Sequence, residues 1–175
     1  APAPLARDGR RQMMLPDRPS SPADGWSPAA LTLYLVDSGP RAIHAYAFAG
    51  DRGTITADRI LVTVPESVGA PDGMTVDAAG DLWVAIYGGG QVHRYAPDGS
   101  LREVYTVPAE VSTCCAFGGP GLTRLYDTTA TEGWRAEQRR AKPAAGLVYR
   151  FDTDATGTPA APFRPISEWW AEATR

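Results

Sequence analysis

An aspartate in the middle of the chain is the best single candidate for chemistry in this sequence. Asp72 stands between Pro71 and Gly73, directly before an apolar run that begins at Met74. Pro71 fixes the backbone on the approach, and Gly73 permits a sharp turn because it has no Cβ. A carboxylate held there could bind a hard divalent cation or polarise a water molecule. The alternative is an Asx turn, since Asp-Gly pairs commonly form turns.

Other polar residues stand where structural roles are favoured. Three aspartates lie in Asp/Gly turns and favour turn chemistry, namely Asp77, Asp81 and Asp98. Asp37–Ser38 follows an apolar run, and it either caps a turn or faces the same region as Asp72. His44 and His93 occupy equivalent places in the similar segments IHAY and VHRY, which favours a structural role for both.

The elements that would position Asp72 form a repeat. Aromatic-bearing pairs recur at Leu33–Tyr34, Leu82–Trp83 and Leu125–Tyr126, at steps of 49 and 43 residues between the aromatic positions 34, 83 and 126. Each pair is followed by an alternating strand and an Asp/Gly turn. Repeats of this length with about four short strands are typical of β-propeller blades. The sequence therefore predicts an all-β fold with about three four-stranded blades.

The middle repeat shows the expected strands in order. We expect them at Met74–Asp77, Leu82–Ile86, Gln91–Tyr95 and Arg102–Val107. The heads of the three innermost strands then fall near Pro22, Asp72 and Thr113. Because innermost strands line the propeller axis, these heads should share one face, which we call the axial mouth.

The repeats predict three regions. Residues 1–25 are expected to be an irregular or disordered lead, 26–165 the blades, and 166–175 a tail that could form a short helix. A charged insertion at Thr131–Ala144 interrupts the third repeat. It predicts a helical excursion on the surface, with a lid over the axial mouth as the alternative.

Composition excludes some functions. The chain has 175 residues and a net charge of −3, which argues against nucleic acid as a partner. We find no apolar run of membrane-spanning length. The adjacent Cys114 and Cys115 should point to opposite faces of a strand, which disfavours a disulfide between them. Reduced cysteines favour a cytoplasmic location.

Several ordered motifs together resemble one family. The sequence is similar to the senescence-marker-protein/gluconolactonase family, which includes regucalcin, from about Trp26 to Phe151. The segments that carry the resemblance are LYLVDS at 33–38, PDGMTVD at 71–77, GDLWVA at 80–85, GGQVHRY at 89–95, STCCAFGG at 112–119 and GLVYRF at 146–151.

This resemblance implies a six-bladed propeller with one divalent cation, calcium or zinc, at the axial mouth, and hydrolysis of sugar lactones. By motif position, the family's metal-ligating and base aspartate corresponds to Asp72. Family members are roughly twice as long as this chain, which matches their C-terminal half. The family's metal-ligating glutamate has no counterpart here, and its asparagine ligand falls on Pro22, which has no donor side chain.

Two functions follow from these observations. The first is a metal-dependent lactonase that hydrolyses gluconolactone-type substrates. This lactonase is incomplete in this chain. The second is a non-catalytic truncated relative that keeps the blades as a binding or scaffold module. Because a row of three blades leaves two sides open, we also expect self-association through the open blade edges.

Overall fold

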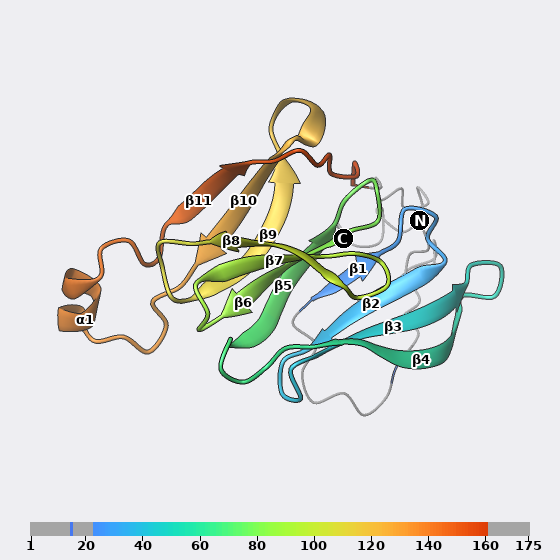
Figure 1. The fold of residues 1–175 in the computed structure, drawn as a ribbon, viewed down its shortest axis with the longest axis horizontal. Coiled ribbons are helices and arrows are strands. Elements are labelled where there is room, and N and C mark those ends of the chain that lie inside the picture. The colour runs from blue at the N-terminus through green and yellow to red at the C-terminus, as the bar shows by residue number, and fades with distance from the viewer. Residues whose placement is uncertain (1–14, 16–22, 161–175) are drawn as a thin grey trace, which may run out of the picture.

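In a computed structural model, residue 15 and residues 23–160 are described, and their strands form three antiparallel sheets (Figure 1). Each sheet is built from strands that are consecutive in the sequence. The first has the order β1-β2-β3-β4, with β1 at Asp24–Trp26, β2 at Thr32–Asp37, β3 at Ala42–Ala49 and β4 at Thr54–Thr63.

The second sheet repeats this meander. It has the order β5-β6-β7-β8, with β5 at Ala70–Val76, β6 at Leu82–Tyr87, β7 at Gln91–Tyr95 and β8 at Leu101–Thr106. The third sheet has the order β9-β10-β11, with β9 at Ser112–Gly118, β10 at Arg124–Thr129 and β11 at Val148–Asp152. A 3₁₀ turn, η1 (Pro120–Leu122), joins β9 to β10.

The sheets stand beside one another as propeller blades. The first strand of each sheet is the innermost one, and β5 lies against both β1 and β9 (Figure 1). Apolar side chains fill the two spaces between blades. Tyr34 and Val36 of the first blade pack with Val84 and Ile86 of the second, and Trp83 of the second packs with Leu125 of the third. The blades therefore share cores with their neighbours, which explains why strands such as β2 and β6 are almost wholly buried and apolar.

The expected blades are confirmed, with differences at their ends. The third strand of the middle repeat matches its expected bounds at Gln91–Tyr95. The innermost strand starts at Ala70, four residues before the expected start at Met74, so Asp72 lies inside β5. The third sheet has three strands among the described residues, one fewer than expected for a blade. Strand β1 begins at Asp24, two residues before the expected start of the blades.

The insertion in the third repeat contains a short helix, α1 (Ala136–Ala141), none of whose residues is buried. In Figure 1 this helix lies at the periphery, well away from the innermost strands β1 and β5. The surface excursion is therefore confirmed, and α1 is no lid over the axial mouth in this structure. None of the helices in the described segments is long and apolar enough to cross a membrane. Residues 1–14, 16–22 and 161–175, which include Pro22 and the expected tail, lie outside the described residues.

Candidate functional site

Asp72 sits in a β-bulge of the innermost strand of the middle blade. Pro71 pairs with Ile86, and the next paired residue of β5 is Met74, which faces Val84. Asp72 and Gly73 therefore oppose the single residue Ala85. Such bulges redirect side chains and occur at barrel rims and beside active sites. The bulge explains how an aspartate within a strand can present its carboxylate at the axial mouth.

Residues of both neighbouring blades contact this bulge. The Ser38 hydroxyl, just after β2, donates a hydrogen bond of 2.8 Å to the carbonyl oxygen of Pro71. On the other side, Cys114 of β9 packs directly against Gly73. A Cβ built on Gly73 would overlap the Cβ, Cα and Sγ atoms of Cys114. Glycine is therefore required at position 73 by the close approach of the third blade, in addition to any turn requirement.

Burial raises the pKa of two groups at this bulge, Asp72 and Cys114. Burial raises the pKa of Asp72, while a hydrogen bond from the Gly73 backbone acts in the opposite direction. Burial also raises the pKa of the Cys114 thiol, and the nearby charges of Asp72 and Asp127 raise it further. A carboxylate with a raised pKa is a better proton acceptor near neutral pH than an ordinary one.

The third blade carries an equivalent irregularity. Thr128 pairs with Cys114 and Thr129 pairs with Ser112, which leaves Thr113 as an extra residue in β9. The Thr113 hydroxyl lies 2.8 Å from the Thr128 hydroxyl. Thr113, predicted from the repeat to lie at the mouth beside Asp72, therefore occupies the equivalent position in the third blade.

A second carboxyl group lies close to the mouth and was missed in the sequence. Asp127 of β10 is fully buried, and the Ser112 hydroxyl donates a 2.6 Å hydrogen bond to its Oδ1. Its Oδ2 has no hydrogen-bond partner among the described residues. Burial raises the pKa of Asp127 to about 6. The repeat contains the signal for this residue, because Leu35 and Val84 occupy the same place after the aromatic-bearing pairs.

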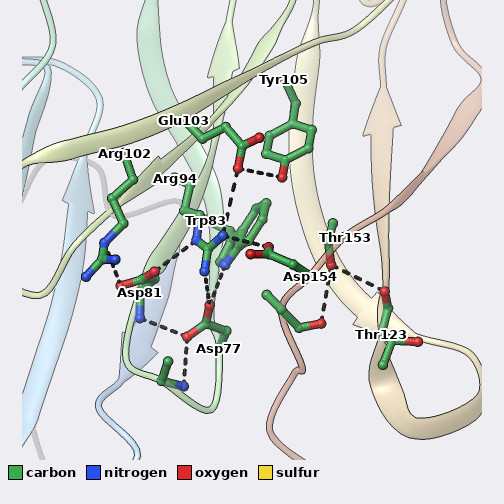
Figure 2. A network of polar contacts seen from close by, with 12 residues as sticks. Asp77, Asp81, Trp83, Arg94, Arg102, Glu103, Tyr105, Thr123, Thr153 and Asp154 are labelled. Carbon is green, nitrogen blue, oxygen red and sulfur yellow. Dashed lines mark hydrogen bonds and ion pairs between the residues drawn. The ribbon is translucent and has the colours of Figure 1, made fainter.

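At the opposite end of the middle blade, acidic groups form a structural network (Figure 2). Asp77 accepts hydrogen bonds from the backbone of Ala79 and Asp81 and from the Trp83 indole. Arg94 bonds to Asp81 at 2.9 Å and lies across the Trp83 ring. The turn role expected for Asp77 is confirmed, and Asp81 adds a buried ion pair to its turn.

The same network ties the second blade to the third. The Arg94 guanidinium forms a 2.8 Å ion pair with Asp154, which follows β11 (Figure 2). Beside it, the Ala78 amide donates to the carbonyl oxygen of Thr156, and Asp77 forms an isolated bridge with Gly157. These contacts fix the end of the blades that lies away from Asp72.

The two histidines have structural partners. His44 lies 2.8 Å from an Asp58 carboxylate oxygen. His93 contacts the Tyr95 hydroxyl and the Gln91 side chain, and burial lowers its pKa. Both histidines are buried in their blades, which confirms the structural role that their repeated positions favour.

The described residues do not complete a metal site. Within residue 15 and residues 23–160, no group of three or more His, Cys, Asp or Glu side chains could hold a metal ion. Asp72 offers one carboxylate, and the side chains placed against its bulge are the Ser38 hydroxyl and the Cys114 thiol. Hard cations such as calcium take six to eight oxygen ligands, so these residues alone do not fit one.

Comparison with known proteins decides the family. The family model described as "SMP-30/Gluconolactonase/LRE-like region" matches residues 5–131. The chain belongs to this family. The match begins about twenty residues before Trp26, where the motifs first indicate the resemblance, and so includes much of the segment expected to be an irregular lead.

Relatives and solved structures agree with this family. The chain is 41% identical over 130 residues to pentonolactonase XacC of Haloferax volcanii, which is 72% of this chain and 45% of that protein. It resembles the calcium-binding protein regucalcin of Agrobacterium tumefaciens with a TM-score of 0.79 and 29% identity, over 90% of this chain and 52% of that one. A gluconolactonase of Xanthomonas campestris matches with a TM-score of 0.60 and 31% identity, over 69% of this chain and 38% of that one.

These comparisons define what the chain contains. It spans about half the length of the curated relatives it matches. Its three sheets correspond to part of a six-bladed propeller. The family includes lactonases and calcium-binding regucalcin, and the expected fold and family are confirmed.

Proposed function

We propose that this chain contributes the base-bearing half of a sugar lactone hydrolase, with Asp72 as the general base. The observation that carries the proposal is the half-buried carboxyl group of Asp72, which stands in a β-bulge of the innermost strand and whose pKa is raised by burial. Membership of a family that includes lactonases supports the choice of substrate class.

The chemistry requires one proton acceptor beside the lactone carbonyl. Asp72 accepts a proton from a water molecule as the water oxygen forms a bond to the carbonyl carbon. The tetrahedral species then re-forms its C=O bond and breaks the ring C–O bond, and the ring oxygen takes the proton back from Asp72, which gives the open hydroxy acid and regenerates the Asp72 carboxylate. A preorganised carboxylate contributes because its position costs no reorganisation at the moment of reaction.

A divalent cation, calcium or zinc, is part of this proposal through the family. Asp72 would supply one of its oxygen ligands. The other ligands would have to come from outside the described residues, because those residues do not form a complete set. The first test of this part is calorimetric titration of the chain with calcium and with zinc, compared with Asp72→Asn.

Hydrolysis of D-glucono-1,5-lactone in a pH-stat tests the catalytic role. Once a second copy or the missing half completes the site, we expect rates above the spontaneous reaction, and a loss of roughly 100-fold or more of that excess in Asp72→Asn. Asp98→Asn is the matched control, since Asp98 is an exposed turn residue of the same blade. Equal excess rates in both variants would refute the role of Asp72.

A scaffold function is the second candidate. It is favoured by one observation, namely that Asp72 lacks a complete set of ligands among the described residues. This candidate predicts no lactone hydrolysis and no metal-dependent heat in the same two assays.

We also propose that the chain self-associates in the cytoplasm through its open blade sides. Val148 and Leu147 of the third blade are 64% and 52% exposed, which leaves apolar surface on the last blade. Multi-angle light scattering should give a mass above 18.7 kDa. A clean monomer with cooperative melting at high temperature would contradict this expectation.

A further inference from the structure

We infer that Ser38 and Cys114 are positioning residues for Asp72, because they hold its β-bulge between the first and third blades. Figure 1 shows β5 between β1 and β9, so the innermost strand of the middle blade has a neighbour on each side. The inference deepens the proposed function, since it explains what fixes the carboxylate that the proposed reaction uses.

The first contact comes from the blade before Asp72. Ser38 is 33 residues away from Pro71 in the sequence, yet its hydroxyl donates a 2.8 Å hydrogen bond to the Pro71 carbonyl. Pro71 is the last residue of β5 that pairs with β6 before the bulge, so a donor on its carbonyl oxygen fixes the backbone where the bulge begins. Ser38 thus determines the backbone orientation at the residue that precedes Asp72.

The second contact comes from the blade after Asp72. The Cys114 Cα, Cβ and Sγ atoms occupy the space that a side chain at position 73 would need. This contact closes the bulge from the side opposite Ser38. The Cys114 thiol also senses the carboxylate, because the charge of Asp72 raises its pKa. Cys114 therefore packs against the bulge, and the reactivity of its thiol can be used to detect changes in the surroundings of Asp72.

These contacts make the geometry of the bulge depend on both neighbouring blades. The bulge has the geometry described above only when the first and third blades both pack against the middle one. Ser38 and Cys114 act through Asp72 and do not themselves touch the reacting atoms. A change at Ser38 should therefore alter the surroundings of Asp72 without altering other parts of the middle blade.

The test uses alkylation of Cys114 by iodoacetamide at pH 8, followed by mass spectrometry on the full chain. Thiolate is the reacting species, and Cys115 is buried, so it serves as an internal reference for folding. We expect Asp72→Asn to speed the reaction several-fold, because Cys114 lies against the bulge and the charge of Asp72 contributes to the raised pKa of its thiol. Ser38→Ala should change the rate in the same direction by a smaller factor, because loss of the hydrogen bond to the Pro71 carbonyl loosens the bulge that holds Asp72 beside Cys114.

A double-variant cycle separates positioning from general loosening. If Ser38 acts through Asp72, Ser38→Ala should add nothing in the Asp72→Asn background. Ser38→Thr keeps the hydroxyl and should restore the original rate. Ser27→Ala is the matched control, because Ser27 accepts backbone hydrogen bonds in the first blade at a turn preceding β2.

Defined results would overturn the inference. The first is an alkylation rate of Cys114 in Ser38→Ala equal to that of the unaltered chain. The second is an undiminished effect of Ser38→Ala on that rate in the Asp72→Asn background. The third is an equal effect of Ser27→Ala on the same rate. None of these readouts depends on lactone hydrolysis or on metal, so they remain decisive if the proposed function fails. Conversely, normal hydrolysis in Asp72→Asn would refute the proposed function and leave the positioning of Asp72 intact.

A glycine pair provides a second, independent test. Gly73→Ala should disturb the bulge, and Gly157→Ala should disturb the opposite end, where a Cβ would overlap Phe117. We expect both variants to melt at lower temperature, but only Gly73→Ala to change the alkylation rate of Cys114. Equal changes in that rate would contradict a local effect at Asp72.

Discussion

The buried carboxyl group of Asp127 predicts a pH dependence of stability that can be calculated from the structure. Its pKa rises from 3.8 to about 6 on folding because the group is desolvated, against the opposing hydrogen bond from Ser112. Between these two values the folded chain holds a proton that the unfolded chain releases. The folded state therefore binds more protons in that window, and stability decreases as the pH rises.

The size of the effect follows from the interval between the two pKa values. At about 1.4 kcal/mol per pH unit, the rise from 3.8 to about 6 corresponds to about 3 kcal/mol. This contribution is fully present only well below the unfolded pKa of 3.8, decreases as the pH rises, and is lost once the pH exceeds about 6. Asp127→Asn cannot ionise, so it should lack this loss while keeping an oxygen that accepts the Ser112 hydrogen bond.

Urea unfolding at pH 4, 5, 6, 7 and 8 measures this difference. We expect the free energy of unfolding of Asp127→Asn, relative to the unaltered chain, to increase by about 2.5 kcal/mol between pH 4 and pH 8, since part of the full effect already lies below pH 4. The measurement compares how the two free energies of unfolding change with pH. A constant destabilisation by the new amide therefore does not affect the result. Asp98→Asn is the control, since Asp98 is exposed and its pKa is lowered by hydrogen bonds from Ser100. A flat difference between pH 4 and pH 8 for Asp127→Asn would refute the reasoning.

Three further variants test the blade structure. Asp77→Ala removes the acceptor of three hydrogen bonds from a buried site, and should cost about 3 to 5 kcal/mol in urea unfolding, whereas Asp98→Ala changes an exposed turn residue and should cost much less. Leu125→Ala empties a fully buried position between the second and third blades, and should cost about 2 to 5 kcal/mol by the same measurement. Lys142→Ala breaks an exposed ion pair with Glu110, and should change the melting temperature by less than a few degrees in calorimetry.

The blades could be predicted because their pattern is local. Alternating apolar residues, aromatic-bearing pairs and Asp/Gly turns recur within each repeat, and these features determine strand and turn positions over a few residues. The third strand at Gln91–Tyr95 is located by this pattern alone. The first strand is located less well, because Ala70–Gly73 contains a proline, an aspartate and a glycine that disfavour a strand in any local scale.

The site could be predicted in part. The position of Asp72 follows from its motif, but the bulge that presents it is created by pairing with Ala85 and by contact with Cys114. Neither interaction can be read from the PDG triplet at 71–73 alone. Asp127 could have been found by comparing the three repeats, since a carboxyl replaces Leu35 and Val84 at one equivalent position. The contacts of Arg94 with Asp154 join residues 60 positions apart, which no local pattern reveals.

The distribution of acidic groups along the middle blade supports the choice of the Asp72 end for chemistry. Asp77 lies five residues beyond Asp72 in an extended strand, which separates the two by about 16 Å. At the Asp77 end, buried carboxylates are matched by Arg94 and by backbone amides, as expected for groups that stabilise a fold. At the Asp72 end, desolvation raises the pKa of both Asp72 and Asp127. A carboxyl group whose pKa is raised by burial, with no cationic partner among the described residues, is a candidate for a functional site.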